Sequence, residues 1–244
     1  IAISANDPDA VVPALKKAAQ RGIKVISWDS GVAAEGRIMH LNPSSNELIG
    51  KMCLQLAANH LEGGKGDFAI LSATTTSTNQ NIWIEEMKKQ LKDFPGLNLA
   101  TTVYGDDLAD KSYREANGLL SSSPNVKVIV APTTVGVLAA SQAVKDAGKI
   151  GQVYVTGLGL RSEMAGAIKS GATKEFAIWN PIDLGYSATQ IAYHLVKGDT
   201  DGAPGAEIEA GRMGKIKVGD NGEAAMADPF VYNSSNIDEF SKIF

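Results

Sequence analysis

The stretch Gly22-Ile-Lys-Val-Ile-Ser-Trp-Asp-Ser30 guides the interpretation of the rest of the chain. Its mostly apolar run, 23–26, follows a glycine and leads into Trp28 and Asp29, a pattern typical of a buried strand in a parallel sheet. Such sheets bind ligands beyond the carboxyl ends of their strands. We therefore predict that Trp28 and Asp29 offer a ring face and a hydrogen-bond acceptor to a polar ligand. Alternatively, Trp28 fills a gap and Asp29 caps a loop.

Strand and helix patterns alternate along most of the chain. Predicted strands are 1–4, 23–28, 37–41, 67–72, 97–104, 126–131, 152–158 and 174–179. Predicted helices begin at Asp7-Pro8, at a capping box formed by Ser44 and Glu47, and at 79, 110, 135, 162 and 182. Repeated strand–helix units indicate an α/β fold with parallel strands and right-handed crossovers. Short strands near Ile208 and Ile216 and a final helix or turn over 233–240 complete the prediction.

Composition narrows the possible functions. The chain has 244 residues and a net charge of −4, without a basic run, so nucleic acid is not an expected partner. No apolar stretch reaches the roughly 18–20 residues that span a membrane. Cys53 is the single cysteine, which excludes an internal disulfide and a cysteine-based zinc site.

The predicted strand ends carry amides, hydroxyls, carboxylates and tryptophan, with little histidine, cysteine or lysine. These ends are Ser4–Asn6, Trp28-Asp29, Ala73–Asn79, Tyr104–Asp107, Ala131–Thr134, Gly157–Gly159 and Trp179-Asn180. Carboxylates and amides hydrogen-bond hydroxyl groups, and aromatic rings stack on the apolar faces of sugars. The set therefore suits a neutral polyhydroxylated ligand. For Trp83, near the start of a predicted helix, a core position and a ligand-facing one remain open.

The sequence motifs give less support to phosphate binding or to catalysis. The glycine run 63–66 precedes a strand, which indicates a turn, and Gly157-x-Gly159 lacks the third glycine of a dinucleotide fingerprint. No G-x-S-x-G or H-E-x-x-H motif is present. Of the three histidines only His40 lies near a predicted lobe boundary. We expect no enzyme activity, no cofactor and no metal site.

Several motifs in order resemble the periplasmic sugar-binding proteins of ABC importers, the type I or ribose-binding-protein-like group. The segments that carry the resemblance are 7–18, 22–30, 79–83, Ala131-Pro132, 176–181 and the tail 227–244. Within this group the chain is most similar to rhamnose-binding proteins, through 157–160 and 177–181, and is related to the Lsr-type autoinducer-2 receptors.

The resemblance implies two doubly wound parallel-sheet lobes joined by a multi-stranded hinge, with the ligand between them. Residues 1–42 and 181–205 would form the amino-terminal lobe, and 43–180 and 206–244 the other. Asn42-Pro43 and Asn180-Pro181 mark the expected boundaries. Because the sequence opens at Ile1 as if within a strand, we expect the amino-terminal lobe to be incomplete.

The resemblance also suggests ligand residues. Asp29 matches an acid of the family, and Asn79-Gln80 falls on an Asp-Gln pair of the autoinducer receptors. Pro132 matches a backbone contact, and Thr134 stands where those receptors have alanine. Trp179 and Asn180 lie where related proteins place a polar ligand. The two changes, at Asn79 and Thr134, favour a sugar over the autoinducer.

The sequence therefore predicts a monomeric periplasmic receptor that passes a monosaccharide, rhamnose or a similar 6-deoxyhexose, to a membrane ABC permease. Three alternatives stay open at this point: the effector domain of a LacI-type repressor, a receptor for autoinducer-2, and a doubly wound enzyme.

Sugar binding should draw the two predicted lobes together, because the chain breaks at Asn42-Pro43 and Asn180-Pro181 are expected to act as hinge positions. Small-angle X-ray scattering should give a smaller radius of gyration at saturating sugar than without sugar. Identical scattering profiles in the two states would contradict closure.

Overall fold

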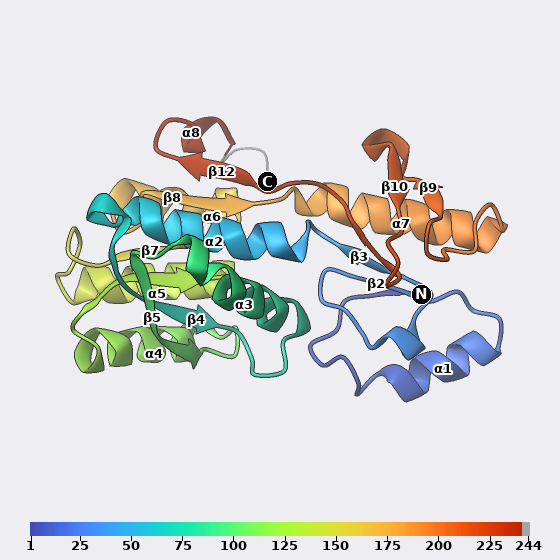
Figure 1. Ribbon diagram of the computed structural model, residues 1–244, viewed down its shortest axis with the longest axis horizontal. Helices are drawn as coiled ribbons and strands as arrows, with labels where there is room; N and C mark the ends of the chain where they lie inside the picture. Colours follow the sequence, from blue (N-terminus) through green and yellow to red (C-terminus); the bar gives the residue numbers. More distant parts are fainter. Residues whose placement is uncertain (241–244) are drawn as a thin grey trace. The chain divides into compact units, whose positions relative to one another are not determined.

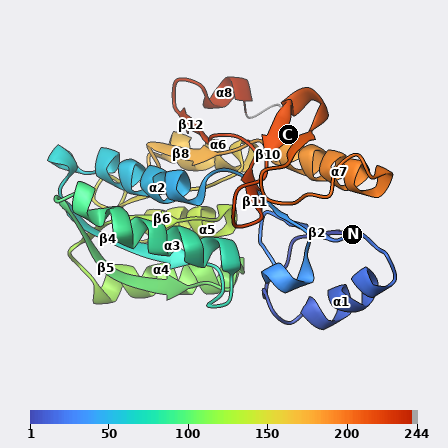
Figure 2. The same cartoon turned by 45° about the vertical axis from the view of Figure 1, so that its right-hand side comes forward.

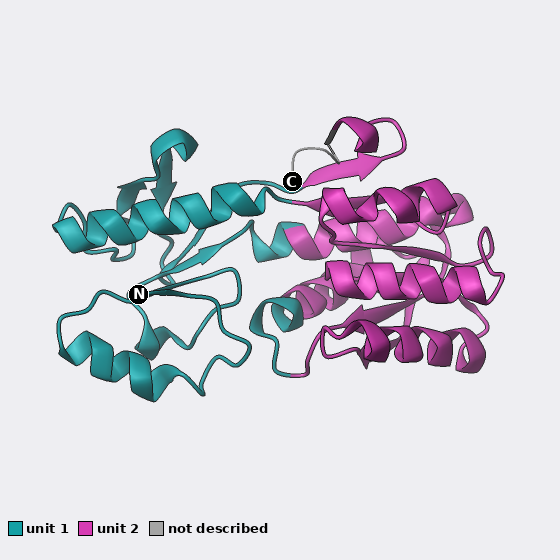
Figure 3. Cartoon of the chain, turned by 180° about the vertical axis from the view of Figure 1, so that it is seen from behind, with its two compact units in different colours: residues 1–48, 76–82, 179–229 teal, residues 49–75, 83–178, 230–244 magenta. Residues whose placement is uncertain are grey.

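A computed structural model describes residues 1–240 and divides the chain into two compact units. Unit 1 contains residues 1–48, 76–82 and 179–229, and unit 2 contains 49–75, 83–178 and the residues from 230 onward (Figure 3). Hydrogen bonds from Thr76 to the carbonyl of Asn6 and from Thr78 to the carbonyl of Gly31 tie the segment 76–82 to unit 1.

Unit 1 is built on a four-stranded parallel sheet in the order β1-β2-β3-β11. The strands are β1 (Ala2–Ile3), β2 (Ile26–Trp28), β3 (His40–Asn42) and β11 (Glu223–Ala225). Two helices, α1 (Val12–Gln20) and α7 (Pro181–Lys197), and the short turn η1 (Ala34–Gly36) accompany them (Figure 1). An antiparallel hairpin, β9 (Glu207–Glu209) and β10 (Lys215–Lys217), encloses the turn η4 (Gly211–Met213).

Unit 2 contains a second parallel sheet, in the order β5-β4-β6-β7. Its strands are β5 (Leu97–Tyr104), β4 (Gly66–Ser72), β6 (Val126–Ala131) and β7 (Tyr154–Gly157), beside the antiparallel pair β8 (Glu175–Ile178) and β12 (Phe230–Asn233). The helices are α2 (Asn46–His60), α3 (Thr78–Gln90), α4 (Ala109–Ser122), α5 (Thr134–Asp146), α6 (Arg161–Ser170) and α8 (Ile237–Phe240), with short turns η2 (Glu62–Gly64) and η3 (Leu91–Asp93). The first residues of α2 and α3 belong to unit 1.

Burial explains why β4 and β6 are the central strands of unit 2. Phe68, Ile70, Val128 and Val130 are fully buried, as expected for strands covered on both faces. Helices α4, α5 and α6 pack against one another in sequence, and α2 approaches α3 closely at Gly50 (Figure 2). This is the layered arrangement of helices around a parallel sheet that the sequence predicts.

The α/β fold with parallel sheets is confirmed, and β5 and β6 have the predicted bounds. Two predicted helix starts are wrong. Helix α1 begins at Val12, because the Asp7 carboxylate accepts hydrogen bonds from the amides of Asp9 and Ala10, both at 2.9 Å, and so caps a preceding turn. The capping box also fails, since the Ser44 hydroxyl is buried without a partner while Ser45 accepts from the Leu48 amide at 3.3 Å.

Strands β11 and β12 were not predicted from the sequence. Glu223-Ala-Ala225 has little intrinsic strand preference, and it becomes a strand only by pairing with β3. Residues 206–229 belong to unit 1, whereas the sequence-based boundaries grouped them with 43–180. Residues 241–244 of the predicted second lobe lie outside the described residues.

Within residues 1–240, none of the helices combines the length and the apolar character that crossing a membrane requires.

Gly157 should tolerate no side chain, because its φ is +136° and a Cβ there would lie 1.9 Å from the carbonyl oxygen of Ala131. We expect Gly157→Ala to lower the free energy of unfolding by about 2 kcal/mol or more. The matched control is Gly166→Ala in α6, where a Cβ meets nothing within 4 Å and a gain of about 0.5–1 kcal/mol is expected. Chemical denaturation of both variants measures the difference, and equal stabilities would contradict it.

Candidate ligand-binding site

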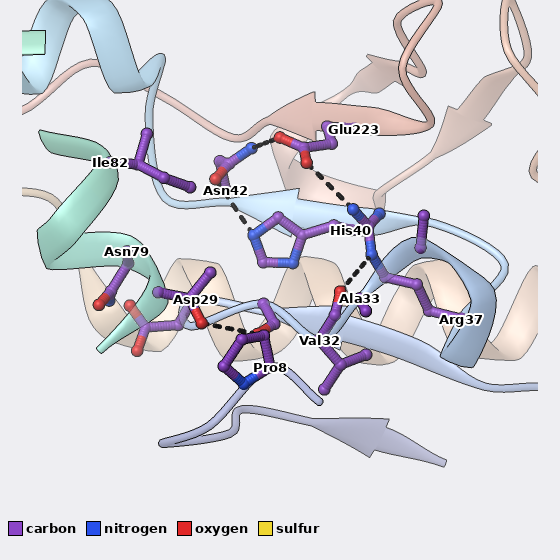
Figure 4. A pocket seen from close by; sticks show the side chains of 13 residues that line it. Pro8, Asp29, Val32, Ala33, Arg37, His40, Asn42, Asn79, Ile82 and Glu223 are labelled. Atoms are coloured by element: carbon purple, nitrogen blue, oxygen red, sulfur yellow. Dashed lines mark hydrogen bonds and ion pairs between the residues drawn. The ribbon is translucent and has the colours of Figure 1, made fainter. Parts of the chain in front are cut away.

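A hollow in unit 1 lies beside the carboxyl ends of β2 and β3 (Figure 4). Its volume is about 130 Å³, smaller than the roughly 300–1,000 Å³ that is typical of small-molecule sites. The residues that line it are Pro8, Asp29, Gly31, Val32, Ala33, Ala34, Arg37, His40, Asn42, Thr78, Asn79, Ile82 and Glu223. We call it the unit 1 hollow.

Sheet register explains why polar side chains gather at one side of the unit 1 hollow. Ser27, His40 and Glu223 occupy paired positions on β2, β3 and β11. Residues in register across parallel strands project from the same face, and Asn42, two residues after His40, shares that face. Trp28 projects from the opposite face, where its indole approaches Gly185 of α7.

A chain of hydrogen bonds links these side chains. The Ser27 hydroxyl lies 2.8 Å from Nδ1 of His40, and Nε2 of His40 lies 3.1 Å from Oδ1 of Asn42. Asn42 Nδ2 donates to Glu223 at 3.0 Å, and Glu223 forms an ion pair with Arg37 at 3.0 Å. Arg37 also donates to the carbonyls of Val32 and Gly222. We call Ser27, His40, Asn42, Glu223 and Arg37 the polar chain (the last four are labelled in Figure 4).

The electrostatics of the polar chain keep His40 neutral. Burial, assisted by the positive charge of Arg37, lowers the pKa of His40 to about 4. The negative charge of Glu223 acts in the opposite direction but does not prevail. Near neutral pH the imidazole therefore carries no charge and serves as a hydrogen-bonding group.

Asp29 is held in an unusual backbone conformation, with a φ of +59° directly after β2. Its amide donates to the carbonyl of Leu41, and its carboxylate lies 3.4 Å from the Ser4 hydroxyl. Burial raises the pKa of Asp29, although hydrogen bonds from Ser4 and from the Ser30 amide oppose the shift. The strained turn thus presents a partly buried acceptor to the unit 1 hollow.

Asn79 lines the same hollow as Asp29, from the start of α3. Its side-chain oxygen accepts from the Ser77 hydroxyl at 3.2 Å and from the Gln80 amide at 2.8 Å. Because these two bonds occupy the side-chain oxygen, the NH₂ group of Asn79 is left to donate a hydrogen bond to a ligand. Asp29 and Asn79 lie at one side of the hollow and Arg37 at the other (Figure 4).

The remaining predicted residues of unit 1 are placed elsewhere. Asn180 caps α7 by accepting from the Ile182 amide at 3.0 Å, and it donates to Asp183 at 2.6 Å. Trp179, just before it, and Gln80 are both largely buried. These residues and Trp28 are not among those that line the unit 1 hollow.

Three predicted residues belong to unit 2. Pro132 follows β6, and the Thr134 hydroxyl accepts from the Leu160 amide at 3.0 Å. The Trp83 indole is only 2% exposed. A ligand role for these three residues stays a prediction.

Sequence reasoning singled out His40 for its place near a lobe boundary, but it did not find Arg37 and Glu223. Glu223 joins the site only because β11 pairs with β3, more than 180 positions earlier in the chain. No motif around Glu223 signals this pairing. Among the described residues no cluster of histidine, cysteine, aspartate or glutamate has the makings of a metal site.

Residues 1–200 match the model of the periplasmic binding protein domain, and the chain belongs to this family. Family membership agrees with the prediction of a binding protein rather than an enzyme. Among curated proteins, the D-ribose/D-allose-binding protein of Pseudomonas aeruginosa is 25% identical over 206 residues, which cover 82% of this chain. The chain spans 64% of the length of that relative.

Solved structures extend the comparison. The chain resembles an ABC transporter solute-binding protein from Clostridium phytofermentas with bound L-rhamnose: the TM-score is 0.94 and the identity 39%, over 100% of this chain and 80% of the other. It also resembles LsrB from Clostridium saccharobutylicum in complex with AI-2, with a TM-score of 0.89 and 21% identity over 98% and 81% of the two chains. The second likeness concerns the fold alone.

The neutral state of His40 predicts a pH dependence of stability. The unfolded chain protonates this histidine at its ordinary pKa of 6.5, whereas the folded chain does so only near 4. The contribution of His40 to stability is therefore greatest above pH 6.5 and falls by about 3 kcal/mol as the pH drops toward 4. Denaturant unfolding of the wild type and of His40→Asn from pH 4 to pH 8 measures this share as the difference between the two curves. Parallel curves would contradict the assignment.

Proposed function

We propose that the protein is a periplasmic solute-binding protein that captures a neutral monosaccharide and delivers it to an ABC permease in the membrane. The observation that carries this proposal is the Asp29 carboxylate, held by a strained turn and directed into the unit 1 hollow. A carboxylate beside an amide donor matches the paired hydroxyls of a sugar. Membership in the periplasmic binding protein family supports the same role.

Rhamnose or a similar 6-deoxyhexose is the proposed ligand. The structure from Clostridium phytofermentas contains bound L-rhamnose, and its sequence is 39% identical to this chain. Asn79 in place of an acid offers a donor to the ligand without a second charge near Asp29. Thr134 adds a hydroxyl and a methyl where the autoinducer receptors have alanine.

The sequence predicts further ligand contacts. Besides Asp29, Asn79 and Thr134, the proposed contacts are Gln80, Trp83, Pro132, Trp179 and Asn180, whereas Trp28, predicted from its place at a strand end, faces α7. Tryptophan rings would supply apolar surface for a sugar face and for the methyl group of a 6-deoxyhexose. We propose that the protein acts as a monomer, without a cofactor and without binding nucleic acid.

Removing the Asp29 carboxylate should weaken sugar binding strongly. Charge-assisted hydrogen bonds contribute roughly 1.5–3 kcal/mol each, so Asp29→Ala should raise the Kd for L-rhamnose about ten- to a hundredfold. Isothermal titration calorimetry measures the change. Asp9→Ala is the matched control, because Asp9 is an exposed acid of unit 1 that does not line the hollow. Equal affinities of the two variants would refute a ligand role for Asp29.

Competition should identify the ligand class. L-rhamnose, D-ribose, other neutral hexoses and pentoses, and the autoinducer are titrated against one protein sample. We expect the tightest binding for a 6-deoxyhexose, because a polar site rejects ligands that leave its buried groups unpaired. Tight autoinducer binding with no response to any pyranose would favour the receptor alternative. Binding of a sugar together with a DNA-binding segment in the complete gene product would favour the repressor alternative.

A further inference from the structure

We propose that Glu223 is a positioning residue for sugar binding, which fixes the amide orientation of Asn42 and the tautomer of His40 and so supports the turn that carries Asp29. The inference rests on the proposed function. Glu223 comes from β11, near the end of the chain, and is joined to β3 by parallel pairing.

Both oxygens of the Glu223 carboxylate are engaged. Oε1 accepts from Arg37 at 3.0 Å and Oε2 accepts from Asn42 Nδ2 at 3.0 Å. The Arg37 side chain is only 8% exposed and that of Glu223 24%. Arg37 is therefore held away from bulk water and Glu223 is partly shielded from it, so the hydrogen bonds between them are stronger than those of a fully exposed pair.

A carboxylate can only accept hydrogen bonds, and this fixes which group donates and which accepts at each step of the polar chain. Asn42 has to turn its NH₂ group toward Glu223, which directs Oδ1 at Nε2 of His40. Nε2 must then carry the imidazole proton. Nδ1 is left as an acceptor for the Ser27 hydroxyl. The charge of Glu223 thus sets the tautomer of a histidine that it does not touch.

The neutral His40 ring in turn supports the Asp29 turn. Ser27, its hydrogen-bond partner, lies two residues before Asp29, and Gly31 lies two residues after it. The ring packs so closely under Gly31 that a Cβ there would meet three ring atoms at 3.3–3.5 Å. The Gly31 carbonyl also accepts from Thr78, the neighbour of Asn79. One ring therefore braces the segments that carry both ligand residues of the hollow.

Replacing Glu223 by glutamine removes this constraint, since a glutamine amide has one acceptor oxygen for the two donors, Arg37 and Asn42. If its oxygen serves Arg37, its NH₂ group faces Asn42, and the Asn42 amide has to flip. Asn42 then presents NH₂ to His40, which requires the proton to move from Nε2 to Nδ1. Glu223→Gln should consequently shift the His40 tautomer even where the fold is retained.

The test combines histidine-resolved ¹⁵N NMR at pH 7.5 with calorimetric titration of L-rhamnose, both on the intact protein. Wild-type His40 should show the Nε2–H tautomer. Glu223→Gln should show a population with Nδ1–H and an affinity for L-rhamnose lowered by about tenfold. Glu209→Gln, at an exposed position of β9, is the matched control and should change neither quantity.

Each outcome bears on the inference. An unchanged tautomer in Glu223→Gln overturns it, and so does a changed tautomer with unchanged affinity. If the variant does not fold, the wild-type spectrum still decides: an Nδ1–H tautomer, or no response of the His40 and Asn42 side-chain resonances to L-rhamnose that binds, overturns it. Absence of binding by wild-type protein to every neutral sugar refutes the proposed function itself, which distinguishes the two failures.

Discussion

The pairing of β11 with β3 is the constraint on which the polar side of the unit 1 hollow depends. It places the Glu223 carboxylate in register with His40, and that carboxylate both neutralises the buried Arg37 and orients Asn42. A buried arginine without such a partner would be costly, because removing one member of a buried ion pair leaves an uncompensated charge. The last third of the chain thus completes a site whose first residues lie near its beginning.

The strained backbone of Asp29 and the uncharged imidazole of His40 act together in this site. Asp29 occupies a left-handed backbone conformation that few residues other than glycine adopt, and the packed ring of His40 lies against the same turn. Burial keeps that ring uncharged, so it can pack closely under Gly31 without bringing a competing positive charge toward the Asp29 carboxylate. The hollow thereby presents an acceptor at Asp29 and a donor at Asn79 from supported positions.

The family and the site point to the same kind of function by separate routes. Matching to the periplasmic binding protein domain covers residues 1–200, whereas Glu223 lies beyond them. The polar groups that line the hollow bear on its chemistry.

The sequence by itself determined the α/β class, most of the strands and helices, and the position of Asp29 at a strand end. Those features follow from local apolar periodicity and from the rule that parallel strands present their carboxyl ends at one edge. Only the tertiary structure decided that Glu223 joins Arg37, Asn42 and His40, that Trp28 faces α7, and that α1 begins at Val12. The physical reason is that a short strand such as Glu223–Ala225 has no local preference strong enough to reveal it, and its partner is chosen by hydrogen bonds between segments far apart in the chain.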